Sequence, residues 1–432
     1  MSRREIHVHH VTRIEGHADI NVVIADGKAE TLRWEVTEAP RLFEAMLVGR
    51  HYDDVSHIAS RICGICSIAH SLASIRATEQ AFGIVPTEQT RQLRRLLFHA
   101  EVLESHLLHC YFLVAPDLLG ADSAFALAAT HGEAVLRAVR MKRLAYTLAD
   151  RIAGRKTHPI SCVVGGFAKL PDEALLEGAR REIEDALPDF EETISLFASL
   201  KLPAFERETE YIALTAPSEY AFLSDTVASS DAGQMPAEQF LAGMEEYCVP
   251  HSTAKHARHA RRSYMVGALA RFNLNADRLH PKARDAASAL NLAAPCHNPY
   301  LISLAQVVEA MHAAEDSLLA IDALLERGIH DESISVTPRA GRGIGAVEAP
   351  RGLLLHDYTY DEAGKLTAAN CVIPTAQNHG SIQEDMDSLL PSLIARSDDE
   401  IRQSLEMLVR AYDPCVSCST HGLRVDVAFD GR

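Results

Sequence analysis

The sequence lacks an uninterrupted apolar run of about 18 residues, the length that a membrane-spanning helix requires. After Arg3-Arg4 its first residues become polar and histidine-rich, without the apolar stretch of a targeting signal. Basic residues are in deficit, since 42 Lys and Arg stand against 59 Asp and Glu, which gives a formal net charge of -17. We therefore expect no direct membrane insertion and no nucleic acid as a main partner.

A disulfide framework is not indicated either, because nine cysteines are an odd number in a chain of 432 residues. Such a content is more typical of a reducing compartment than of a secreted scaffold, so we expect a cytoplasmic protein. The length is sufficient for a large buried core, and by length alone the chain could hold two or three domains.

The hydrophobic pattern predicts strands first and helices afterwards. An apolar run at residues 20–24, a turn at Asp26-Gly27 and an alternating stretch at residues 30–36 indicate a β-hairpin. From about residue 65 onward, apolar residues recur at steps of three and four, as on the buried face of a helix. We expect a mainly α fold, with a large helical bundle over residues 61–421 and small peripheral β elements within residues 1–60.

Local signals mark the end of the chain's last helix. A capping box begins that helix at Ser397. Because Asp413 precedes Pro414, it is disfavoured in helical geometry, so the helix should end just before Cys415. The glycine-rich residues 339–345 are predicted to be a turn, and they lack the strand-to-helix frame of a phosphate-binding loop.

Two Cys-x-x-Cys pairs, Cys63/Cys66 and Cys415/Cys418, lie near opposite ends of the chain. Two thiols at this spacing can bind one metal centre, and four converging thiolates form a soft site that only the folded chain assembles. Structural zinc is the simplest alternative, although zinc ligands usually come from a compact stretch. The spacing alone leaves the zinc interpretation open.

The sequences around both pairs carry further information. The first pair lies in Arg61-Ile62-Cys63-Gly64-Ile65-Cys66, and the second in Asp413-Pro414-Cys415-Val416-Ser417-Cys418-Ser419-Thr420-His421. Other motifs follow the same order over nearly the full length: Arg13-Ile14-Glu15-Gly16-His17, Arg41-Leu42-Phe43-Glu44, His158-Pro159, Glu348-Ala349-Pro350-Arg351-Gly352 and Cys371-Val372-Ile373-Pro374-Thr375-Ala376-Gln377-Asn378. Together they closely resemble the large, catalytic subunit of nickel-iron hydrogenases, and this combination disfavours zinc.

The resemblance implies a hydrogenase large-subunit domain over residues 1–421, with a nickel-iron centre. Cys63 and Cys415 would bind nickel alone, whereas Cys66 and Cys418 would bridge nickel to an iron that carries carbon monoxide and cyanide. Soft thiolates suit both metals. The implied reaction is reversible heterolytic cleavage of H2 to protons and electrons, which needs a Lewis-acidic metal and a nearby base.

The resemblance also assigns catalytic roles. Cys415 would be the first base, and Glu15 would carry the proton onward. Without its motif, Glu15 would be interpreted as a surface partner of Arg13 or His17. Arg351 would lie over the open face of the metals as a fixed cation that stabilises developing charge.

Residues near the iron ligands are implied as well. Pro374 and Thr375 would contact the cyanide and carbonyl groups, the Thr375 hydroxyl donating a hydrogen bond. His70 would hydrogen-bond the sulfur of Cys66 if that segment is helical. Three histidines near one predicted helix face are interpreted as core residues rather than ligands: His99, His106 and His109.

A second, harder metal site is implied near the C-terminus. Glu44, His421 and the backbone carbonyl of Cys371 match the positions that hold magnesium, or iron, in the family. A carboxylate, a carbonyl and water suit magnesium, whereas histidine is an unusual ligand for it. This second site therefore rests on the resemblance.

The chain departs from many membrane-bound and periplasmic relatives. Ser105 stands where those carry an aspartate, which would deprive Arg351 of a carboxylate partner, and Gln377-Asn378 replaces Trp-Asn. Both features resemble the soluble cytoplasmic branch, which couples H2 to NAD(P), to a deazaflavin or to heterodisulfide reduction. Residues 422–432 follow His421, the point after which a maturation protease removes a tail in the family.

No further cysteine cluster suits an iron-sulfur centre, and no dinucleotide fingerprint occurs. Electrons should therefore leave through an iron-sulfur small subunit, followed by further electron-transfer subunits linked to flavin or NAD(P), to deazaflavin or to heterodisulfide reductase. The alternatives are an H2-sensing regulatory hydrogenase, a non-catalytic subunit related to respiratory complex I, and a zinc-stabilised scaffold. Because function resides in the site rather than in the fold, metal content, turnover and partner identity separate them.

Overall fold

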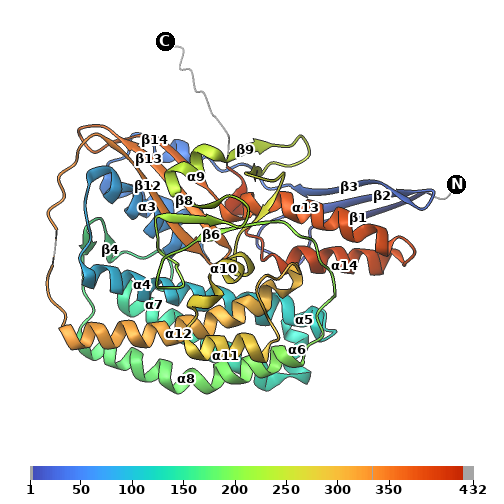
Figure 1. Cartoon of the computed structure of the whole chain (residues 1–432), viewed down its shortest axis with the longest axis horizontal. Helices are drawn as coiled ribbons and strands as arrows, with labels where there is room; N and C mark the ends of the chain where they lie inside the picture. The colour runs from blue at the N-terminus through green and yellow to red at the C-terminus, as the bar shows by residue number, and fades with distance from the viewer. Residues whose placement is uncertain (1–2, 333, 422–432) are drawn as a thin grey trace, which may run out of the picture.

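The structure, a computed structural model of the chain, describes residues 3–332 and 334–421. About half of the chain is helical, and the strands form small sheets. The long helices pack together in the lower half of Figure 1, the N-terminal sheet projects to one side, and most of the remaining strands lie above the helices. Within the described ranges, no helix combines the length and the apolar character that a bilayer crossing requires.

The helices bury apolar side chains at the steps that a 3.6-residue period requires. Their bounds are α1 Phe43–Leu47, α2 Tyr52–Ala59, α3 Ser67–Phe82, α4 Glu88–Leu108, α5 Ala115–Leu118, α6 Ala124–Thr130, α7 Gly132–Ala153, α8 Glu173–Ser199, α9 Ala237–Gly243, α10 Ala268–Asn275, α11 Pro281–Ala289, α12 Ile302–Arg327, α13 Pro374–Leu393 and α14 Asp398–Ala411.

The strands form five sheets within the described residues. Two are antiparallel and three-stranded, β1-β2-β3 (Arg3–Val8, Ala18–Ala25, Lys28–Val36) and β12-β13-β14 (Gly341–Ala349, Gly352–Tyr360, Leu366–Val372). The others are β11-β6-β7-β8 (Tyr264–Met265, Glu210–Leu214, Thr226–Ser229, Gly233–Pro236), β10-β9 (Lys255–Arg258, Glu245–Cys248) and β4-β5 (Cys162–Val163, Gly166–Phe167).

Several sequence predictions are confirmed. The hairpin is β2-β3, and its turn places Asp26 and Gly27 at positive φ, 51° and 73°. The capping box of α14 is present, with Ser397 accepting from the backbone N–H of Glu400. The helix ends at Ala411 as predicted, before the second cysteine pair. The expectation of β structure near the N-terminus is incomplete, however, because the part from 61 to 421 also contains sheets.

The prediction that residues 339–345 form a turn is wrong, because most of them belong to β12. Every second residue of that strand, Gly341, Gly343 and Gly345, faces the backbone of α3. A Cβ at Gly345 would overlap the carbonyl oxygen of Ala73, and one at Gly343 would overlap that of Ala77. The glycines therefore allow a strand to pack directly on a helix backbone, a close approach that is a recognised use of glycine in strands.

We expect Gly345→Ala to destabilise the protein by about 3 kcal/mol or more, because the added methyl group forces β12 away from α3. Gly132→Ala is the matched control, since nothing lies within 4 Å of the position of its Cβ. It should change stability by less than about 1 kcal/mol. Urea unfolding midpoints of the two purified variants measure the difference, and equal midpoints would contradict the packing argument.

This architecture brings distant segments of the chain together. The loop before α3 carries the first cysteine pair, and the loop after α14 carries the second. The second loop pairs in parallel with the N-terminal loop, since Val416 N–H donates to the carbonyl of Glu15 over 2.9 Å. The next strand-to-helix junction, between β14 and α13, supplies Thr375.

Candidate metal centre

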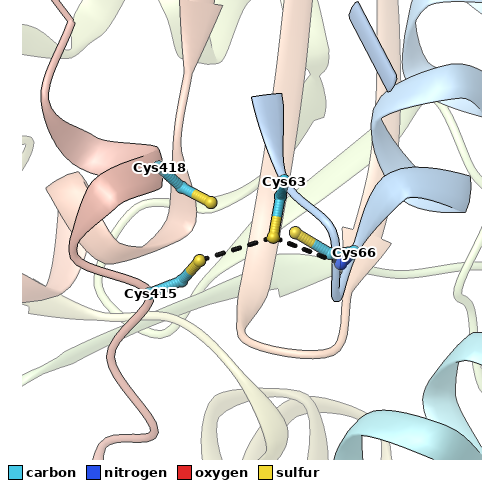
Figure 2. Close-up of side chains that lie close together, drawn as sticks. All are labelled: Cys63, Cys66, Cys415 and Cys418. Atoms are coloured by element: carbon cyan, nitrogen blue, oxygen red, sulfur yellow. Dashed lines mark hydrogen bonds between the residues drawn. The ribbon is translucent and has the colours of Figure 1, made fainter. Parts of the chain in front are cut away.

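The four cysteines of the two motifs converge in the core. Figure 2 shows their sulfurs pointing toward a common centre, and all four lie within 4.8 Å of one another. The sulfurs of Cys63 and Cys415 are 3.6 Å apart. Metal–thiolate bonds of about 2.3 Å in a tetrahedral arrangement separate sulfurs by roughly 3.7 Å. The buried quartet therefore fits a bound metal, although this spacing would suit zinc as well.

The local backbone prepares the first pair for the thiolate form. Cys66 is the residue that precedes the first turn of α3, so it lies at the positive end of a helix dipole. The backbone N–H groups of Ile65 and Cys66 both donate to the sulfur of Cys63 over 3.3 Å. A short loop before a helix thus orients both sulfurs and stabilises negative charge on one of them.

The thiols differ in their proton affinity. A hydrogen bond with Cys415, together with those from Cys418 and Cys66, lowers the pKa of Cys63 well below that of a free thiol. Hydrogen bonds with Cys418 and Cys63 raise the pKa of Cys415. The quartet therefore does not hold a full set of protons, and it can release those that remain to a metal ion.

Glu15 lies beside the second pair. The Cys415 thiol donates to its Oε2 over 3.2 Å, and the backbone N–H of Ser417 donates to the same oxygen over 3.1 Å. The Ser417 hydroxyl donates to the other carboxylate oxygen. The surface interpretation, a pairing with Arg13 or His17, is therefore wrong, because Arg13 pairs with Asp117 and His17 with Glu38.

Arg351 is buried above the cysteine loop, and it has a carboxylate partner that the sequence analysis missed. Its Nη2 lies 2.8 Å from Asp413 Oδ1, and its Nε donates to the Asp413 carbonyl over 2.7 Å. Asp413 has a φ of 51°, and its second carboxylate oxygen accepts from Gln306 over 3.2 Å. The expected loss of a partner, inferred from Ser105, is therefore wrong. Nη1 of Arg351 remains buried without a hydrogen-bond partner among the described residues.

A second arginine that the sequence did not single out fixes the segment before Arg351. Arg271 is fully buried, and two of its nitrogens bond the carboxylate of Glu309, each over 2.6 Å. The same guanidinium donates to the Pro350 carbonyl over 3.0 Å and contacts Glu348, whose pKa burial raises to about 7. This network is invisible in sequence because its members are far apart along the chain.

Three other predicted residues border the quartet or its helices. Pro374 and Thr375 open α13, and the Thr375 oxygen accepts from the backbone N–H of Cys415 over 3.0 Å, which leaves its hydroxyl proton available. His70 is buried in the first turn of α3, and its Nδ1 lies 3.1 Å from His356 Nε2. Burial lowers the pKa of His70 to about 3, so the ring is neutral.

The residues predicted for the second metal also meet. His421 Nδ1 lies 2.7 Å from Glu44 Oε2, while His421 Nε2 and Glu44 Oε1 are buried without a hydrogen-bond partner. The ammonium group of Lys255 lies 3.6 Å from that free oxygen, and Cys371 is fully buried at the end of β14. An unpartnered carboxylate oxygen and imidazole nitrogen in the core suit a metal ligand set.

The three histidines of α4 and its extension have protein partners. His106 bonds Glu309 over 2.7 Å, and His109 bonds Gln306 and the Arg410 carbonyl. His99 lies 3.3 Å from the Ser317 hydroxyl oxygen. None of them belongs to a metal-like cluster in the described part of the chain, which agrees with their interpretation as core residues.

Comparison with known proteins identifies this centre. The family model described as nickel-dependent hydrogenase matches residues 41–135 and 240–421. The alpha chain of sulfhydrogenase 1 from Pyrococcus furiosus is 33% identical over 97% of this chain and 98% of its own length. The matching polypeptide of the F420-non-reducing hydrogenase from Methanothermobacter marburgensis is 34% identical over 95% of this chain and 93% of its own length.

Solved structures agree with the sequence comparison. An NAD+-reducing NiFe-hydrogenase in the H2-reduced state superposes with a TM-score of 0.87 at 25% identity, covering 97% of this chain and 99% of that chain. The Ni-Fe-Se hydrogenase of Desulfovibrio vulgaris Hildenborough superposes with a TM-score of 0.79, also at 25% identity, covering 97% and 100%. The chain therefore belongs to the nickel-dependent hydrogenase family, as the large, catalytic subunit of a nickel-iron hydrogenase that acts on H2.

Proposed function

We propose that this subunit cleaves and forms H2 reversibly, with Cys63 and Cys415 as ligands of nickel alone and Cys66 and Cys418 as bridges to iron. The bound metals would supply Lewis acidity toward H2. The observation that carries the proposal is the 3.2 Å contact between the Cys415 thiol and the Glu15 carboxylate, at the edge of a buried thiol quartet. A soft metal site with an adjacent proton acceptor is what heterolytic cleavage requires.

The proton route follows from the contacts of Cys415. Its sulfur would accept the proton released from H2 and pass it to Oε2 of Glu15, the oxygen that it already contacts. Glu15 is half-buried, so its carboxylate lies between the core and the solvent side of the N-terminal loop. The two hydrogen bonds from Ser417 would hold the carboxylate in place during the transfer.

Other side chains would shape the environment of the centre. Arg351, fixed by Asp413 through two hydrogen bonds, would present its free Nη1 to the developing charge. Thr375 would donate its remaining proton to a cyanide or carbonyl ligand of iron, and Pro374 would pack against the same ligands. His70 would act on the sulfur of Cys66 from the adjoining helical turn.

A magnesium or iron ion would occupy the second site. Glu44 and His421 would bind it through the two buried atoms that lack partners, and the carbonyl of Cys371 would complete the protein ligands. Such an ion would tie the C-terminal loop to α1 and β14, so it would support the loop that carries Cys415 and Cys418.

We further propose a cytoplasmic complex in which an iron-sulfur small subunit takes the electrons. The sulfhydrogenase relative is named as one chain of a larger enzyme, and the similar solved structure is of an NAD+-reducing enzyme, which favours further electron-transfer subunits. Those subunits would be linked to flavin or NAD(P), to deazaflavin or to heterodisulfide reductase. The domain would span residues 1–421. The tail 422–432, which a maturation protease would remove, lies outside the described residues.

Infrared spectroscopy and metal analysis of the protein purified with its partners test this proposal. We expect carbonyl and cyanide stretches, with one nickel and at least one iron per large subunit. Zinc in the quartet, without these bands, would overturn it. Rapid H2-dependent reduction of a dye would separate a catalytic enzyme from an H2 sensor, which turns over slowly.

We expect Arg351→Lys to lower turnover by a factor of about 100 or more while the metal content stays normal, because lysine cannot keep both bonds to Asp413 and still present a free donor. Arg342→Lys is the matched control, because Arg342 lies on the preceding strand and pairs with Asp357 at the surface. H2-driven dye reduction, normalised to nickel, gives the comparison. Equal turnover of the two variants would remove Arg351 from the reaction.

A further inference from the structure

Two histidines and an aspartate form a cluster at the surface of the N-terminal sheet. His9 and His10 directly follow β1, and Asp19 lies near the start of β2. The loop between these positions carries Glu15, and it is closed by the hydrogen bond from Val11 N–H to the Ala18 carbonyl, over 2.9 Å. The cluster therefore joins the two ends of the Glu15 loop.

The distances in this cluster suit a metal ion. His9 Nδ1 lies 3.1 Å from Asp19 Oδ2, and His10 Nδ1 lies 3.5 Å from Asp19 Oδ1. One nitrogen of each ring and a carboxylate oxygen all lie within 4.8 Å of one another. A metal with bonds of about 2.0–2.2 Å to nitrogen and oxygen places neighbouring ligand atoms roughly 3 Å apart, so an ion fits with little movement.

The three ligands are held in place before any metal binds. The backbone N–H of His10 donates to Asp19 Oδ1 over 2.8 Å, which orients the carboxylate. His10 has a φ of 60°, and its ring stacks on that of His9 with centroids 4.2 Å apart. The His9 and His10 side chains are 77% and 51% exposed, so water can complete the coordination shell.

Another cluster of the same composition shows what opposes metal binding. His280, His312 and Asp316 are also close together, but Arg95 pairs with both oxygens of Asp316. His312 Nδ1 accepts from the backbone N–H of His280 over 3.2 Å, so its other nitrogen carries the proton of the neutral ring and is no ligand. Among the described residues, no lysine or arginine forms an ion pair with Asp19, so the surface cluster lacks this obstacle.

We propose that His9, His10 and Asp19 form a peripheral site for a divalent transition metal of the zinc or nickel class, separate from the cysteine quartet. Two imidazoles and one carboxylate bind nickel and zinc more tightly than manganese or iron(II). A bound ion would clamp the two ends of the loop that carries Glu15. Through that clamp, and this part rests on the proposed relay role of Glu15, the ion would slow proton exchange with solvent.

Titration calorimetry with zinc, and in parallel with nickel, on the assembled and loaded enzyme tests the site after a mild chelator has removed peripheral metal. We expect one additional zinc per large subunit, and His10→Ala or Asp19→Asn should each weaken its binding at least about tenfold. His7→Ala is the matched control, because His7 is an exposed histidine of β1 whose Nδ1 bonds Asn21. It should bind zinc as the unchanged protein does.

Cobalt provides a second readout, because nitrogen ligation would give it visible absorption that His9→Ala/His10→Ala should lose. Failure of the unchanged protein to bind more zinc than this double variant would overturn the site. H/D exchange under H2 tests the clamp: saturating zinc should slow it, EDTA should restore it, and His10→Ala should be insensitive. Zinc that binds at the site without changing exchange would overturn the link to Glu15.

Discussion

Replacing Cys415 by serine is expected to abolish both nickel retention and H2 turnover. A serine hydroxyl is a harder ligand than a thiolate and stays protonated near neutral pH, so it cannot replace a soft anionic ligand. The substitution also removes the sulfur that contacts Glu15 at 3.2 Å, and with it the proposed first base. Nickel and iron content, measured together with H2-driven dye reduction, should both fall.

Cys162→Ser is the matched control for this prediction. Cys162 is also buried, at 1% exposure, but it lies in β4 and takes no part in the quartet. We expect this variant to keep its nickel and most of its activity, since only a small apolar contact is changed. A fully active Cys415→Ser variant would remove Cys415 from the set of ligands, whatever the control shows.

The sequence was sufficient for features that depend on neighbouring residues. The turn at Asp26-Gly27, the capping box at Ser397 and the end of the last helix before Pro414 each involve residues within a few positions of one another. The metal quartet could also be predicted, although its two pairs lie far apart, because each pair is a recognisable local motif. Resemblance to a family then indicated that the two pairs meet.

Features that depend on unmarked contacts between distant segments could not be predicted. Asp413 was interpreted only as a helix-ending residue, but its carboxylate pairs with Arg351, which lies 62 positions earlier in the chain. The glycines of β12 suggested a turn because glycine is disfavoured in strands. Their role becomes clear only when Ala73 and Ala77 of α3 lie against them, a partner that no local pattern in β12 identifies.

Glu15→Gln is expected to slow H/D exchange under H2 by a factor of about 100 to 10,000, the usual contribution of a positioned acid or base. Glutamine has nearly the same shape, and its carbonyl oxygen can still accept from the Ser417 backbone N–H, so the loop should keep its position. It cannot take up a proton from the Cys415 sulfur. Nickel and iron content should therefore stay close to that of the unchanged enzyme.

Two control variants separate the proton relay from loop geometry. Glu38→Gln removes a carboxylate that bonds His17 in the same part of the sheet without contact to the cysteines, and it should leave exchange unchanged. Ser417→Ala removes one hydrogen bond to Glu15 but keeps the carboxylate, so its effect should be much smaller than that of Glu15→Gln. If Glu15→Gln lost metal as well as exchange, the contact with Cys415 would be structural. If exchange stayed normal with the metals in place, protons would leave the sulfur by another route.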